Sequence, residues 1–170
     1  MEVLLFIFPL LSFLLFQFFN QKIRSEILYA VNIFLFGLSF LLSLYIFIKI
    51  LNLDKDLPLF FYSLIKLENL FIDWKLRFDL LVSGLAVLVT FIGLLITVYS
   101  INLSKNNLIN FQINSYLPLS IFGLLVLISS NNLIQFFLGW YIIILSSYFF
   151  SNISENKVGI KNVFFEKRIS

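Results

Sequence analysis

The sequence predicts an all-α integral membrane protein with about five transmembrane helices and a short surface β-hairpin between the second and the third. Two observations predict this fold. Of the 170 residues, 61% are hydrophobic and only 12% are charged, whereas about a quarter of the residues in soluble domains are charged. The apolar residues are also gathered into long runs without Asp, Glu, Lys or Arg. About 20 apolar residues suffice to cross a bilayer.

Five charge-free runs define the predicted spans. The first run is near the lower length limit for a span and the fourth is shorter still. Pro9 in the first run is tolerated in lipid where neighbouring groups satisfy the freed carbonyl. A turn signal of two Ser and two Asn residues at 129–132 predicts a tight helical hairpin there. We predict one transmembrane domain over 1–170, with spans at about 3–19, 27–48, 80–99, 115–128 and 133–150.

The connection between the second and third runs is polar and contains an alternating segment at 70–79. Trp74, Leu76 and Phe78 alternate there with charged neighbours. A period of two predicts a half-buried strand or hairpin, here at the membrane surface. Trp74 suits the aromatic belt at the interface between membrane and water. A second polar loop is expected at 102–114, and a polar tail follows residue 150.

The composition excludes several classes of function. The chain has no Cys and no His, so thiolate and imidazole ligands for zinc, haem or iron–sulfur clusters are missing. The net charge is only +3, and the basic residues are not interleaved with aromatic stacking platforms as nucleic-acid binding would require. No phosphate-binding loop, catalytic triad or pair of carboxylates is present. We therefore expect no metal site, no nucleic-acid partner and no catalytic chemistry in this chain alone.

Two positions are candidate sites of proton transfer. Asp79 lies at the entry to the third run, where a carboxylate is also favoured by the helix dipole. Tyr141 lies early in the fifth run, where its ordinary role is helix packing or a place in the interfacial belt. Other polar residues within the runs could line a seam between helices, although packing is their usual role: Asn32, Thr90, Thr97, Gln135, Ser146 and Ser147.

Three motifs carry a resemblance to a known family. They are WKLRFDL at 74–80, VTFIGLL at 89–95 followed by YSI at 99–101, and SNNLIQFFLGW at 130–140. From about Phe71 onward these stretches resemble the antiporter-type membrane subunits of respiratory complex I, most closely NADH dehydrogenase subunit 5, with subunit 2 as the alternative. The third motif is the most specific, and the tail at 161–169 resembles the family more faintly.

The resemblance implies a role in proton translocation coupled to electron transfer from NADH to quinone. The family carries a carboxylate directly after the Gly-Trp pair, and here that position is Tyr141. A phenol stays neutral at pH 7, whereas a buried carboxylate can load and release a proton. The resemblance places NADH, flavin, iron–sulfur clusters and quinone on other subunits, so that the chain would act in a translocase without binding a cofactor itself.

Family members have twelve or more helices, so the resemblance predicts a fragment of a split subunit whose remainder comes from a second chain. Other complex I membrane subunits and lipids are the remaining expected partners. The predicted location is the mitochondrial inner membrane, with a bacterial plasma membrane as the alternative. Lys and Arg are more frequent on the side of the carboxyl tail, which predicts the amino terminus outside and that tail in the matrix or cytoplasm. A structural subunit without a proton path and a standalone transporter or assembly factor are alternative functions.

Overall fold

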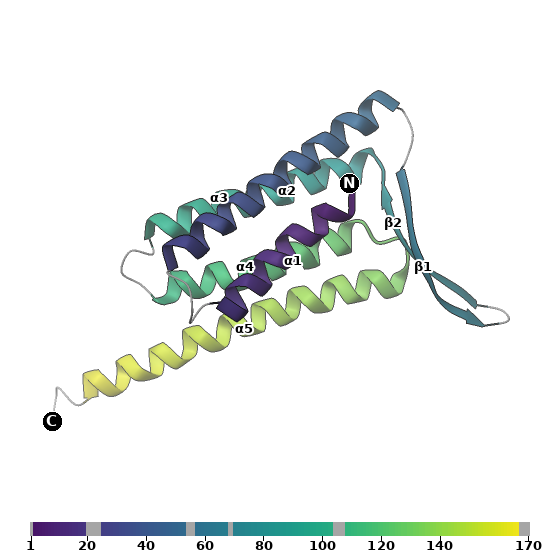
Figure 1. The fold of residues 1–170 in the computed structure, drawn as a ribbon. Coiled ribbons are helices and arrows are strands. Elements are labelled where there is room, and N and C mark those ends of the chain that lie inside the picture. Colours follow the sequence, from purple (N-terminus) through teal and green to yellow (C-terminus); the bar gives the residue numbers. More distant parts are fainter. Residues whose placement is uncertain (1, 20–24, 54–56, 68–69, 104–107, 167–170) are drawn as a thin grey trace.

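A computed structural model of the chain describes residues 2–19, 25–53, 57–67, 70–103 and 108–166, with side chains described at 3–18, 27–52, 76–100 and 115–151. Within these residues the chain forms five helices and one two-stranded sheet (Figure 1). The elements are α1 (Glu2–Phe19), α2 (Ser25–Leu53), β1 (Leu57–Leu67), β2 (Leu70–Phe78), α3 (Leu80–Leu103), α4 (Leu108–Ile128) and α5 (Leu133–Glu166). The predicted fold class, five helices with a hairpin between the second and the third, is confirmed.

The helices run back and forth along one common direction. The amino terminus, the β-hairpin and the α4–α5 turn lie at one end of the bundle, and the carboxyl terminus lies at the other (Figure 1). Packing joins α1 to α2 and α4, α3 to α2 and α4, and α4 to α5. This arrangement follows from the apolar runs, because a helix satisfies its own backbone hydrogen bonds in lipid and leaves only its side chains to pack.

The helices are longer than the predicted spans. The expected polar loop at 102–114 is mostly helical, since α3 continues to Leu103 and α4 begins at Leu108. The polar tail is helical as well, since α5 continues to Glu166. A run of apolar residues ends at the first charge or polar cluster, but a helix can continue through Asn, Ser and Lys where no strong breaker stops it. The segment 102–114 contains neither Gly nor Pro.

Three of the described helices are long and apolar enough to cross a membrane, namely Ile27–Asn52, Leu80–Ser100 and Leu133–Ser151. The described apolar parts of the other two, Val3–Phe18 and Ser115–Ile128, are shorter. Five membrane crossings therefore remain a prediction. The basic residues behind the predicted orientation, including Lys22, Lys105 and Lys157, lie outside the residues or side chains described.

The β-hairpin projects from one end of the bundle (Figure 1). Its strands are antiparallel, pair Leu59 with Leu76, and contain two irregularities in register. The predicted alternation at 70–79 corresponds to β2, whereas β1 carried no comparable signal. The side chain of Trp74 lies outside the described side chains, so its place in an interfacial belt remains a prediction. At its base, Leu76 and Phe78 are buried, and the backbone N–H of Arg77 donates to the carbonyl of Ser129 at 3.1 Å.

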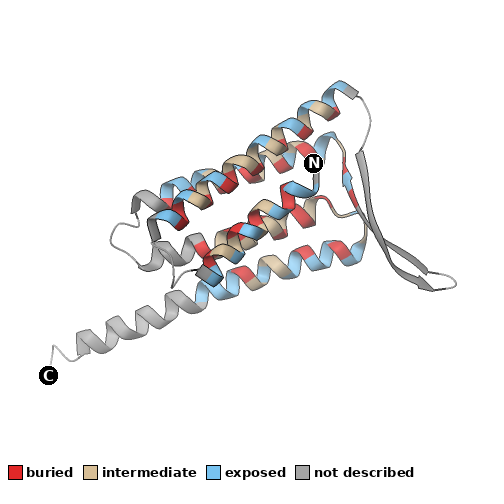
Figure 2. Cartoon of the chain, in the orientation of Figure 1, coloured by how far each residue is buried: buried red, intermediate tan, exposed pale blue. Residues whose placement is uncertain are grey.

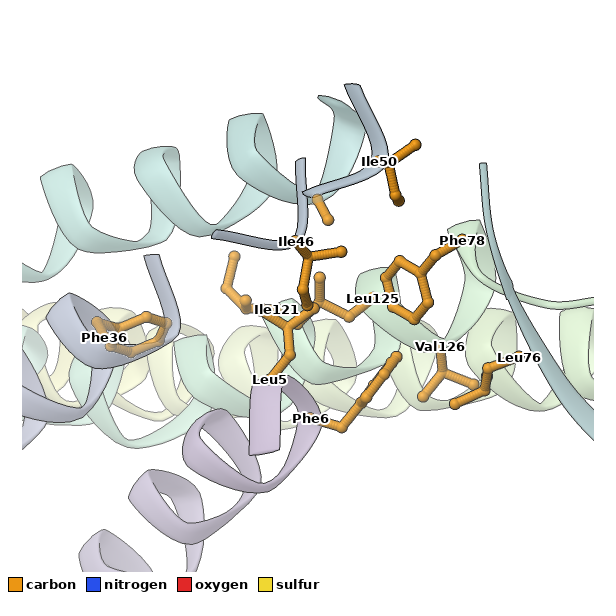
Figure 3. Packing of buried hydrophobic residues seen from close by; sticks show 11 residues of the cluster. Leu5, Phe6, Phe36, Ile46, Ile50, Leu76, Phe78, Ile121, Leu125 and Val126 are labelled. Atoms are coloured by element: carbon orange, nitrogen blue, oxygen red, sulfur yellow. The ribbon is translucent and has the colours of Figure 1, made fainter. Parts of the chain in front are cut away.

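The core is apolar and is concentrated toward the hairpin end. Phe6 and Phe78 pack edge to face with ring centroids 6.1 Å apart, and Leu76 lies beside Val126 in the same cluster (Figure 3). Buried residues face the interior of the bundle, while the outer faces of the helices are exposed (Figure 2). Of the three long apolar helices, α5 is the least covered by the rest of the bundle, since only 17% of its apolar stretch is buried. Its outer face must therefore contact lipid or another protein segment.

Candidate functional site

The inner face of α3 is made entirely of small residues. Its buried positions recur every three or four residues, as in a coiled-coil seam, and none has a side chain larger than Thr: Ser83, Ala86, Thr90, Gly93, Thr97 and Ser100. Small residues allow helix backbones in a membrane to approach closely. The stripe explains why α3 can pack between α2 and α4, and it includes part of the VTFIGLL motif.

Two hydroxyl groups meet across the α2–α3 seam. The side-chain oxygens of Ser43 and Thr90 are 2.9 Å apart, and both residues are at most 1% exposed. The other hydroxyls of the α3 stripe bond within their own helix; Thr97, for example, donates to the carbonyl of Gly93 at 2.7 Å. Each of these hydroxyls thus uses its single hydrogen within its own helix. The seam is therefore a packing feature with one polar bond between helices.

A second polar contact joins α1 to α2. The Ser12 hydroxyl donates to the side-chain carbonyl of Asn32, and both residues are 1% exposed. Asn32, a candidate from the sequence, thus has a partner that sequence reasoning did not name. Of the remaining candidates, Ser146 is buried and Ser147 is exposed, and each donates to a carbonyl three residues earlier in α5.

The closest helix contact lies between α4 and α5. A Cβ atom built at Gly139 would lie 2.8 Å from the backbone nitrogen of Leu127 and 3.0 Å from the carbonyl oxygen of Gly123. Only glycine fits between two backbones at this distance. Gly139 belongs to the FFLGW segment of the most specific motif, so the structure supplies a steric reason for that glycine. Sequence reasoning did not single out Gly123 or its pairing with Gly139.

Gln135 is the exception among the buried polar side chains. It is 2% exposed, and neither its amide oxygen nor its amide nitrogen has a hydrogen-bond partner. The sequence suggested Gln135 as part of a polar seam, and the structure places it on the buried side of α5. The α1–α2 and α2–α3 contacts described above involve other residues.

Asp79 forms the amino-terminal cap of α3. Its carboxylate accepts a hydrogen bond from the backbone N–H of Val82 at 2.8 Å, and its carbonyl accepts one from the N–H of Ser83 at 2.9 Å. A side-chain oxygen that accepts from the third residue of a helix is the usual capping arrangement. Its carboxylate also pairs with Arg77, whose Nε lies 3.8 Å from a carboxylate oxygen, with the two side chains 54% and 31% exposed. An ion pair this exposed contributes little to stability.

Tyr141 points away from the bundle. Its side chain is 61% exposed and lies on the uncovered face of α5 together with Phe137, Trp140 and Tyr148. The structure therefore does not bring Tyr141 together with Asp79, which lies at the hairpin end of α3. Neither position forms a closed site among the described residues, and their role in proton transfer remains a prediction.

Charged side chains are confined to one end of the described bundle. Of the residues whose side chains are described, only Lys49, Arg77 and Asp79 are charged, and they lie at the end where the hairpin joins. The same part of the chain contains no group of three His, Cys, Asp or Glu residues that could hold a metal ion. The described middles of the helices thus offer hydroxyls, one free amide and no fixed charge.

Comparisons with known proteins connect these features to a family. Residues 64–102, which cover part of the hairpin and nearly all of α3, match the family model described as NADH-ubiquinone oxidoreductase (complex I), chain 5 N-terminus. The chain is 31% identical to NADH-ubiquinone oxidoreductase chain 5 of Acanthamoeba castellanii over 96% of its length, and 30% identical to that of Chondrus crispus over 89%. It is 28% identical to NADH-quinone oxidoreductase subunit L of Rickettsia typhi over its whole length.

The chain is similar to chain 5 of complex I over most of its length. The resemblance found in the motifs is confirmed, and these matches favour chain 5 over the subunit 2 alternative. The chain covers 27%, 23% and 25% of the three relatives just named, so it spans about a quarter of their length. Three described helices are able to cross a bilayer, and the chain is similar to membrane subunits of complex I. The chain is therefore a multi-pass inner-membrane protein, as predicted.

Proposed function

We propose that the chain is a membrane-arm component of NADH:ubiquinone oxidoreductase and corresponds to the amino-terminal part of its chain 5. The observation that carries this proposal is the similarity to chain 5 over nearly the whole chain, together with the match to the amino-terminal family model across the hairpin and α3. The mitochondrial inner membrane is the proposed location. Other membrane subunits of the complex and lipids are its partners, and NADH, flavin, iron–sulfur clusters and quinone belong to other subunits.

Within that complex, we propose that the chain contributes to proton translocation as part of a translocase and supplies no redox chemistry. A structural role without its own proton path is the second candidate. It is favoured by one observation, that the described middles of the helices contain no Asp, Glu, Lys or Arg. Transport of a charge through the bundle would then need a carboxylate or lysine from outside the described residues. The two candidates differ in whether substitutions here change protons moved per electron.

We further propose that other helices of the chain 5 subunit pack against α3 and α5. The exposed faces of these helices support this arrangement. Leu81 and Tyr99 on α3 are 68% and 69% exposed, and Leu133 and Phe137 on α5 are 72% and 59% exposed. Such faces pack against lipid or other helices, and family relatives are about four times as long as this chain.

Affinity purification of the tagged chain from its native membrane tests the first proposal. Recovery of a megadalton assembly that oxidises NADH is the expected result, whereas recovery of the chain by itself would support a standalone transporter or assembly factor. Photo-cross-linking from Leu81 on α3 and Phe137 on α5, which are 68% and 59% exposed, tests the packing proposal in the same preparation. Cross-links to other helices of chain 5 are the expected result, and cross-links to lipid alone would refute it.

A further inference from the structure

The amide of Gln135 is a buried polar group that the proposed function does not use. Its side chain is 2% exposed, and both of its polar atoms lack a hydrogen-bond partner. A primary amide can donate two hydrogen bonds and accept two. The large majority of buried polar atoms in proteins have a partner, either protein or ordered water. Among the residues that the structure describes, no side chain or backbone group supplies that partner for Gln135.

The position of Gln135 in the helical hairpin can be derived from Gly139. Residues four apart lie on the same face of a helix, and Gly139 faces the backbone of α4 at Leu127. Gln135 therefore also faces α4, one helical turn nearer the 129–132 turn. At that turn the hairpin base is fixed by the bond from Arg77 to Ser129 and by a β-bridge between Leu76 and Ser130. The amide thus lies beneath the joint between the sheet and the α4–α5 hairpin.

Local capping does not satisfy the amide. The spacing from Asn132 to Gln135 matches a capping box, in which the side chain at the third helical position bonds back to the N–H of the cap residue. The Gln135 side chain makes no such bond. Most of the last carbonyls of α4 are already used, since that of Leu125 accepts from the N–H and the hydroxyl of Ser129 and that of Leu127 accepts from both groups of Ser130. A guest of the amide would therefore have to supply both the donor and the acceptor that the amide lacks.

The groups around the Gln135 amide favour a small neutral ligand. The first turn of α5 and the 129–132 turn contain no Asp, Glu, Lys or Arg. The nearby Arg77 and Asp79 side chains are 54% and 31% exposed and pair with each other, so the buried amide itself offers no charge to compensate a metal ion or an anion. A water molecule both donates and accepts, as the amide requires. Buried waters make about three hydrogen bonds to groups that would otherwise be unsatisfied. We propose that Gln135 binds a water molecule enclosed between α4 and α5 beneath the base of the β-hairpin.

An experimental density map of the assembled complex, at a resolution that shows other buried waters, tests the proposal directly. The expected result is a solvent peak at about 2.7–3.2 Å from an amide atom of Gln135. Two results would overturn it. One is a direct bond from the amide to protein, such as the backbone N–H of Asn132, and the other is no peak at Gln135 where other buried waters are seen.

The substitution Gln135→Leu gives a second test. The sign of the change in thermal midpoint distinguishes an amide that binds water from one that does not. Leucine has a similar volume and no polar atoms. If the amide binds water, the substitution removes partners from that water and lowers the thermal midpoint of the complex. If the amide is dry, leucine raises the midpoint by removing unsatisfied groups. The control is Thr97→Val, which removes a buried hydroxyl bonded only within its own helix. A midpoint for Gln135→Leu equal to or above that of the control would refute the water site.

Discussion

Replacing Gly139 with alanine adds one methyl group between the two closest backbones of the bundle. The added Cβ would lie 2.8 Å from the nitrogen of Leu127, which is 0.6 Å short of the 3.4 Å at which ordinary contact begins. The obstacle is backbone, so no side-chain rotation relieves it. We expect α4 and α5 to separate locally, which also loosens the contacts around the 129–132 turn.

The loss of stability can be estimated from other substitutions that add atoms to a packed interior. Adding a methylene to a packed interior destabilises by about 1–3 kcal/mol, equivalent to a factor of about 5 to more than 100 in an equilibrium constant. Gly123→Ala should cost less, because the nearest atoms to its Cβ belong to the side chains of Ile142 and Ile143, both at 3.0 Å. Gly37→Ala is the matched control within α2, where nothing lies within 4 Å of the added atom.

The assay is the amount and thermal midpoint of the assembled complex in membranes that carry each variant. The expected order of stability is Gly37→Ala, then Gly123→Ala, then Gly139→Ala, with the first close to the unsubstituted chain. Because all three changes add the same methyl group to a helix, intrinsic helix propensity does not explain a difference among them. A Gly139→Ala complex as stable as the Gly37→Ala complex would show that the close α4–α5 contact does not exist in the membrane.

Four further outcomes are expected. Asp79→Ala should destabilise by about 1 kcal/mol through loss of the cap, while Asp79→Asn keeps the cap; normal assembly of Asp79→Asn with impaired proton translocation would instead place the carboxylate in a proton path. A double-mutant cycle of Ser43→Ala and Thr90→Val should give a coupling of about 0.6 kcal/mol, typical of hydrogen bonds between membrane helices, and zero coupling would contradict the bond seen across the seam. Tyr141→Phe should leave assembly and protons moved per electron unchanged, because the hydroxyl is on the uncovered face; a sharp fall in translocation with normal assembly would refute that expectation. A tag after Ser170 should resist protease added outside sealed organelles, and its digestion there would reverse the predicted orientation.

The helices and the hairpin could be predicted because their signals are local. Runs without charge locate the helices, and the alternation around Trp74 identifies β2. The helix ends could not be found in the same way, because hydropathy reports where the chain leaves lipid and not where the helix stops. At 102–114 the chain is polar, yet α3 continues to Leu103 and α4 begins at Leu108, and no Gly or Pro in this segment marks a helix end.

The pairing of polar groups could not be predicted from the chain alone. Asn32 and Thr90 could be selected as candidates because they interrupt apolar runs. Their partners, Ser12 and Ser43, depend on the register in which the helices pack, and hydropathy does not specify register. The stripe of small residues on α3 was partly visible, since Gly93 and its small neighbours suggested close approach. The α4–α5 contact was missed because Gly123 and Gly139 lie on different helices.

The direction in which Tyr141 points indicates which groups a carboxylate at this position would contact. A side chain at this position leaves the five-helix bundle on the uncovered face of α5 and is 61% exposed. A glutamate there, as the resembled family has, would therefore meet groups outside the bundle and not the Ser43–Thr90 bond inside it. The described buried seams contain small hydroxyls that bond within their own helices or, in the Ser12–Asn32 and Ser43–Thr90 pairs, to a neighbouring helix. Such seams are suited to close packing and contain no charged group. Any proton path that uses this position would run along the outer face of α5, against the lipid or protein that contacts this face. A phenol here in place of the carboxylate that the resemblance implies would therefore change that outer face and leave the interior of the bundle unchanged.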